Sequence, residues 1–103
     1  AMMRGEASIR IPRRADQRYA LCAAMVHHLW QGPDDTLERR ITGFFDISEQ
    51  LSSDFAAMAM VDALTGPDEQ TTKARTDRLM GHPRFERWTQ YHGEAFMSQQ
   101  VAA

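Results

Sequence analysis

Residues 34–64 read DDTLERRITGFFDISEQLSSDFAAMAMVDAL and hold a regular apolar pattern. Apolar positions recur at alternating intervals of four and three residues, the spacing of a helix that buries one stripe of its surface. Gly43 and the polar cluster at residues 46–48 are weak helix breakers, so this stretch is either one long or kinked helix or two helices divided near residue 46. We expect one helix. The stripe consists of Leu37, Ile41, Phe44, Ser48, Leu51, Phe55 and Met58.

Turn signals bound this stretch on both sides. Gly32-Pro33 precedes it and Gly66-Pro67 follows it, and acidic residues come directly after each proline. Glycine suits the residue after a helix, proline cannot continue one, and acidic side chains are favoured at the positive end of the next helix dipole. Both turns therefore separate helices.

Working outward from these turns, the sequence predicts further helices over about residues 13–30, 67–80 and 84–101. The chain of 103 residues has the size of one domain. We expect an all-α fold, a small bundle of about four helices spanning residues 13–103, with an extended basic arm at residues 1–12.

Composition and cysteine content indicate the class of protein and the compartment in which we expect it. Hydrophobic residues make up 43% and charged residues 25% of the chain, which is ordinary for a globular protein. The single cysteine, Cys22, excludes an intramolecular disulfide and fits a reducing compartment. No apolar run approaches the ~20 residues that span a bilayer, and the N-terminus does not resemble a signal peptide. We expect a cytoplasmic protein without a membrane partner.

The N-terminal arm suggests one function. Residues 1–18 contain five arginines and two acidic residues, whereas the rest of the chain is acidic. Residues 7–12, ASIRIP, alternate polar and apolar side chains directly before a helix, and so locally resemble the opening of ribbon-helix-helix DNA-binding proteins. The resemblance covers 12 to 18 residues and implies that Ser8 and Arg10 face DNA bases. The candidate nucleic-acid-binding residues are Ser8, Arg10, Arg13, Arg14 and Arg18.

Catalytic and metal-binding motifs are missing from the sequence. It contains no HExxH pattern, no glycine-rich phosphate loop and no G-x-S-x-G turn, and no His lies four residues from another. We therefore predict no cofactor, no metal and no catalytic residue, and lean against an enzyme. A ligand pocket or metal site formed across helices near His28, His92 and Trp88 stays open.

The leading hypothesis is a non-catalytic protein that works by protein–protein interaction, as a homodimer or with another protein. Residues 37–64 hold more apolar side chains than one helix face needs, since Phe45, Ile47, Met60, Val61 and Leu64 lie off the stripe. A second apolar face in so small a domain indicates an interface. The candidate partner-binding residues are Trp88, Tyr91, Phe45 and Ile47. The alternative is a DNA-binding regulator that uses the arm.

Overall fold

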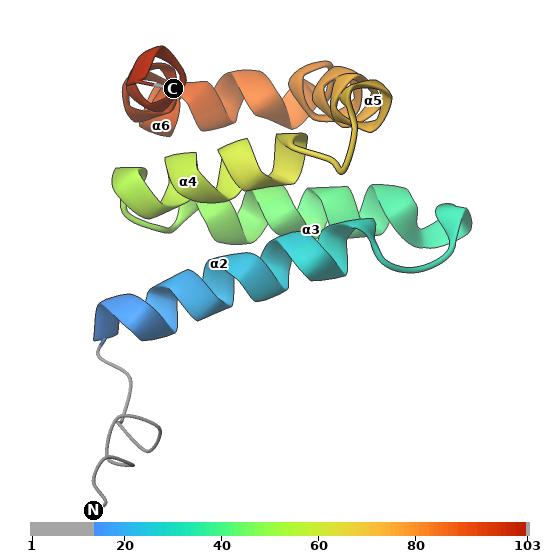
Figure 1. Cartoon of the computed structure of the whole chain (residues 1–103), viewed down its shortest axis with the longest axis horizontal. Helices are drawn as coiled ribbons and strands as arrows, with labels where there is room; N and C mark the ends of the chain where they lie inside the picture. Colours follow the sequence, from blue (N-terminus) through green and yellow to red (C-terminus); the bar gives the residue numbers. More distant parts are fainter. Residues whose placement is uncertain (1–13, 103) are drawn as a thin grey trace, which may run out of the picture.

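The computed structural model describes residues 14–102, which fold into five α-helices and one short 3-10 helix (Figure 1). No strand occurs within this range, so the predicted all-α fold is confirmed. The number of helices is five rather than about four, and the arm at residues 1–12 lies outside the described range. The elements are α2 (Arg14–Trp30), η1 (Asp34–Thr36), α3 (Leu37–Glu49), α4 (Ser53–Leu64), α5 (Glu69–Met80) and α6 (Pro83–Ala102).

The additional helix arises because residues 34–64 do not form one continuous helix. α3 ends at Glu49, and α4 begins at Ser53 after Ser52, whose backbone is extended with φ −61° and ψ 154°. Serine is common at the residue before a helix; here the Ser52 side chain makes no capping hydrogen bond, and its carbonyl accepts from the Ala56 N–H at 2.8 Å. The expected single helix was therefore wrong, and the division falls at residues 50–52 rather than near residue 46.

α2 and α3 are joined by a turn that one arginine stabilises. Gly32 has φ 120°, a conformation that suits glycine after a helix. The Arg40 guanidinium donates from Nε to the Leu29 carbonyl and from one terminal nitrogen to the Pro33 carbonyl, both at 3.0 Å. A positive charge that binds the last carbonyls of a helix also interacts favourably with the helix dipole.

α4 is the central helix of the fold. It lies between α2 and α6 in Figure 1 and contacts α2, α3, α5 and α6. A helix surrounded in this way is apolar on nearly all sides. Its buried residues are Ala56, Ala57, Ala59, Met60, Ala63 and Leu64.

The surplus of apolar residues over 37–64 is explained by this central position. Phe45 and Met60 are fully buried and Leu64 is nearly so, although all three lie off the predicted stripe. They pack inside the same chain, because α4 has neighbours on several sides. Only Ile47 of the off-stripe residues is strongly exposed. The surplus of apolar residues over 37–64 therefore does not by itself indicate a partner-binding surface.

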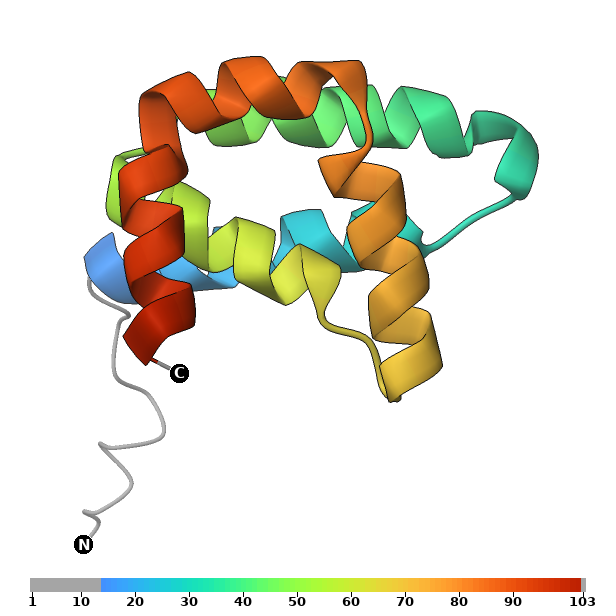
Figure 2. The same ribbon diagram turned by 90° about the horizontal axis from the view of Figure 1, so that it is seen from above.

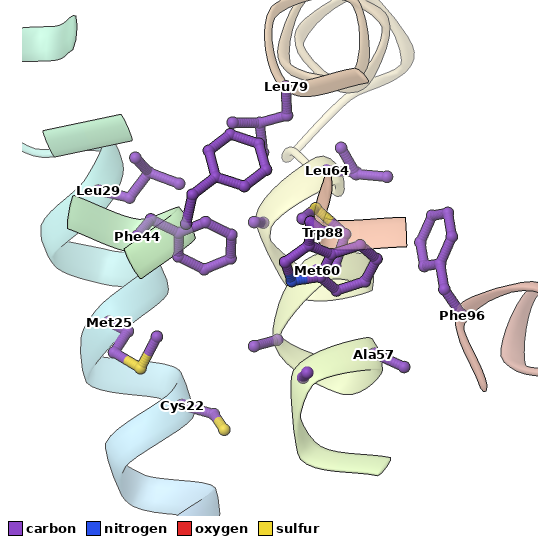
Figure 3. Packing of buried hydrophobic residues seen from close by; sticks show 14 of the residues in the cluster. Cys22, Met25, Leu29, Phe44, Ala57, Met60, Leu64, Leu79, Trp88 and Phe96 are labelled. Atoms are coloured by element: carbon purple, nitrogen blue, oxygen red, sulfur yellow. The ribbon is translucent and has the colours of Figure 1, made fainter. Parts of the chain in front are cut away.

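The core extends on both sides of α4 (Figure 3). Leu29 of α2 and Phe44 of α3 pack on one side, and Trp88 and Phe96 of α6 pack on the other. The indole N–H of Trp88 donates to the hydroxyl of Ser48 at 3.1 Å, which satisfies two buried polar groups. This hydrogen bond attaches α6 to α3.

α5 and α6 complete the bundle. The Asp68 carboxylate accepts from the Thr71 backbone N–H at 2.7 Å and caps the start of α5. Figure 2 shows the first half of α6 running beside α3 before the helix changes direction. None of the helices described is long and apolar enough to cross a membrane.

Candidate protein-binding surface

A groove lies between α2 and α3 on the surface of the protein. Its cavity has a volume of about 190 Å³. An added Cβ on Gly43 would meet no atom within 4 Å, so the surface over this residue is open. The groove is lined by Met25, His28, Arg39, Arg40, Gly43, Phe44 and Ile47.

Two exposed apolar side chains belong to the helix faces that border the groove. Ile47 on α3 is 50% exposed, and Leu21 on α2 is 49% exposed. Leu21 is four residues before Met25 and seven before His28, so the three lie on one side of α2. We use the name α2–α3 face for the surface formed by Leu21, Met25, His28, Arg39, Gly43, Phe44 and Ile47.

The α2–α3 face is apolar in its middle and basic at one end. Arg39 is exposed, whereas Arg40 is held by its bonds to the turn after α2. An apolar centre with a polar rim is the usual composition of a protein interface. Four other large apolar side chains are strongly exposed among the described residues, but they lie elsewhere: Tyr19, Met80, Tyr91 and Met97.

The four residues predicted to bind a partner do not share a surface. Ile47 lies on the α2–α3 face, and Tyr91 is exposed on α6 beside Ser53 and Asp54. Phe45 and Trp88 are fully buried, so their predicted place on a contact surface was wrong. Tryptophan is common at protein interfaces, which favoured an exposed position, but a helix turns by about 100° per residue, so the charged Arg87 next to Trp88 faces a different direction.

The arginine arm falls mostly outside the described residues. Ser8, Arg10 and Arg13 are not described, and Arg14 is the first residue of α2. The guanidinium of Arg18 lies over the ring of Phe55 at 5.4 Å from its centroid. This contact attaches the start of α2 to α4, so Arg18 has a role within the fold that the sequence did not indicate.

His28, His92 and Trp88 do not form a common site. His28 is exposed on the α2–α3 face, whereas His92 packs against Trp88 on α6, with 5.3 Å between the ring centroids. Within residues 14–102, no three His, Cys, Asp or Glu side chains gather as a metal site requires.

Sequence reasoning missed a partly buried hydrogen-bonded pair, Ser53 and His92. The Nε2–H of His92 donates to the Glu49 carbonyl at 3.0 Å, because a carbonyl oxygen can only accept. In the neutral ring, Nδ1 then carries the lone pair and accepts from the Ser53 hydroxyl at 2.9 Å, and the same hydroxyl also lies 3.3 Å from the Tyr91 carbonyl. The two residues are 39 positions apart, so no local motif reveals them.

A histidine that accepts a serine proton is also the starting geometry of nucleophilic catalysis. Here His92 is 5% exposed, and both of its ring nitrogens connect α6 to the chain between α3 and α4. We assign the pair a structural role, namely to hold the division between α3 and α4 against α6.

Cys22 is fully buried, and its thiol donates to the Phe55 carbonyl at 3.8 Å. Burial raises the pKa of this thiol, and the nearby Asp62 carboxylate adds to the increase. Because the thiolate is the reactive form, we assign Cys22 a structural role.

A second depression, of about 410 Å³, lies beside Trp30, between α2, α4 and α5. The Arg75 guanidinium stacks over the Trp30 ring at 5.0 Å and donates to the Thr65 carbonyl at 3.1 Å. Burial raises the pKa of the neighbouring Asp62. The arginine is thus engaged in attaching α5 to α2, which leaves the α2–α3 face as the better candidate surface.

A charged cluster connects α3 to the turn before α6. The Glu38 carboxylate accepts from His82 Nε2 at 2.6 Å and from the Arg78 guanidinium at 3.3 Å. The His82 ring stacks on the buried Phe45, with 5.1 Å between centroids. The His82 hydrogen bond lowers the pKa of Glu38, and Arg78 lowers it further.

This cluster predicts a pH-dependent contribution to stability. Because the pKa of Glu38 is lower in the folded chain than its ordinary value of 4.5, its contribution is present above pH 4.5 and is lost as the pH falls through the folded value. Glu38→Gln should therefore be less stable than wild type above pH 4.5, and the two should converge at lower pH. Urea denaturation at a series of pH values below 6 measures this. A difference that stays constant to the lowest pH would contradict the assignment.

Comparison of the chain with protein families, with characterised proteins and with solved structures finds no match.

Proposed function

We propose that this protein acts by protein–protein interaction and that its α2–α3 face binds a second copy of the chain. The observation that supports this most directly is the exposed Ile47 beside the open surface over Gly43. Ile47 and Leu21 are each about half exposed, and covering them removes apolar area from water. No metal or cofactor is needed for such a role.

The exposed apolar side chains of α6 are less suitable as a contact surface. Tyr91 and Met97 are exposed on α6, but the depression beside Tyr91 is lined by Asp54, Glu94 and Ser98. A carboxylate-rich lining is costly to desolvate, and acidic residues are depleted in interface centres. The α2–α3 face has an apolar groove without acidic lining, so we assign self-association to it.

The test is the oligomeric state of the purified chain and of one variant. Ile47→Glu places a carboxylate at the centre of the proposed contact, so the dissociation constant of the dimer should rise by at least about tenfold. Sedimentation velocity over a range of protein concentrations measures the constant.

Met97→Glu is the matched control, because Met97 is 64% exposed on a different helix. This variant should dimerise like the wild type. Equal weakening by both substitutions would show that the α2–α3 face is not the contact surface. A wild-type chain that stays monomeric at every concentration would reject the proposal.

A further inference from the structure

Charges of opposite sign occupy the two ends of the outward side of α3. Arg39 lies near the start of the helix and Asp46 near its end, and both are exposed. Their separation of seven residues amounts to nearly two helical turns, so both side chains project from nearly the same side, about 10.5 Å apart along the axis. Gly43 lies between them on this side.

This order of charges is self-complementary under one operation. When a second α3 is turned end to end about a two-fold axis beside Gly43, its Asp46 comes opposite the first Arg39, and its Arg39 comes opposite the first Asp46. The contact forms twice, as an isologous interface requires. A parallel arrangement in register would instead bring like charges together, which is unfavourable.

We infer that two copies of this chain pack α3 against α3 in antiparallel orientation, with Arg39 of each copy facing Asp46 of the other. This inference rests on the proposed self-association through the α2–α3 face. It specifies the orientation of the partner and the residues that select it.

Gly43 permits the close approach that this arrangement needs. An added Cβ there would meet nothing within 4 Å, so the open space is available to a partner helix. Ile47 lies about one turn beyond the axis and would lie against the start of the partner's α3, near its Arg39. The same packing thus buries the most exposed apolar side chain of α3.

Asp46 already forms one ion pair, with Arg84, and its carboxylate can bind a second cationic side chain. Arg84 of α6 donates to its Oδ1 at 2.7 Å, while Glu49 binds both Arg84 and Arg87. The Asp46 side chain is still 55% exposed, and Oδ2 has no ion-pair partner among the residues described. Arg39 likewise forms no ion pair with other residues in this part of the chain.

Charge reversal in two separate proteins tests the arrangement. Arg39→Glu places four acidic side chains together at the two contacts, and Asp46→Lys places four basic ones there. Each variant alone should dimerise about tenfold or more weakly than the wild type, because attraction at both contacts becomes repulsion. An equimolar mixture should form a heterodimer of nearly wild-type affinity, since both contacts are then again between opposite charges.

Native mass spectrometry distinguishes the heterodimer from either homodimer by mass, and sedimentation measures the affinities. Circular dichroism confirms that each variant is folded, as Asp46→Lys also loses its bond to Arg84. Lys73→Glu and Asp77→Lys provide the control, because these residues form a similar exposed pair on α5 at 3.1 Å. Neither control variant, nor their mixture, should change dimerisation.

Two outcomes overturn the inference separately from the proposed function. If the wild type dimerises and neither charge reversal changes the affinity, the chain self-associates, but not in this orientation. Weak homodimers that do not recover on mixing reject the pairing of Arg39 with Asp46. A monomeric wild type rejects the proposed function itself, and this orientation with it.

Discussion

Replacing Trp88 with alanine should lower the free energy of unfolding by about 3–5 kcal/mol, the usual cost of deleting a large buried aromatic side chain. The ring is fully buried and packs against Phe85, His92 and Phe96. Its N–H also donates to the buried Ser48 hydroxyl, which would lose that partner. Urea denaturation followed by circular dichroism measures the change.

Tyr91→Ala provides the control on the same helix, because Tyr91 is 57% exposed. Its effect should stay within about 0.5 kcal/mol, as is usual for surface substitutions. Trp88→Phe should fall between the two, since it keeps much of the packing and removes the donor to Ser48. A loss for Trp88→Ala no larger than that for Tyr91→Ala would contradict the position of Trp88 in the core.

Replacing Ala57 with leucine should lower the free energy of unfolding by about 1–3 kcal/mol or more, because a packed core has no room for three added carbon atoms. Ala57 is fully buried on the central helix α4. Leucine is nearly as good a helix former as alanine, so the loss reports packing rather than helix propensity. Thermal and urea denaturation both measure it.

The same substitution at Ala24 is the control, since Ala24 is exposed on α2. Ala24→Leu should change the free energy of unfolding by less than about 0.5 kcal/mol. If Ala57→Leu were equally harmless, α4 would not be the closely packed centre of the fold.

The ends of several helices could be predicted from the sequence because local interactions determine them. Gly32-Pro33 and Gly66-Pro67 were assigned to turns, and helices do end before each of them. Glycine conformation, the missing proline N–H and the helix dipole act over a few residues, so the signal is present in the local sequence.

The division at residues 50–52 was not predicted, although Ser52 and Ser53 are typical of a helix start. The apolar stripe runs through this division, because α3 and α4 both contribute to one core. A periodic pattern therefore reports which side chains are buried, and the direction of the backbone at the junction depends on packing. His92 and Ser53 help to hold that junction, and their contact joins distant residues.

The candidate surface was predicted only in part. Ile47 was selected as an off-stripe apolar residue and is exposed, whereas Phe45 was selected for the same reason and is fully buried. The two residues differ by about 200° around α3, and only the positions of the neighbouring helices decide which direction is outward. Hydrophobicity alone cannot separate a core residue from an interface residue.

The sequence by itself determined the helical class and the turns at residues 32–33 and 66–67, since these depend on propensities and on interactions within a few residues. The tertiary structure decided that α4 is central, that Trp88 is buried, and that Ile47 borders an open groove. Burial is a sum of contacts from segments far apart in the chain. Each helix can satisfy its own backbone hydrogen bonds alone, but which of its faces meets water is determined by its neighbours.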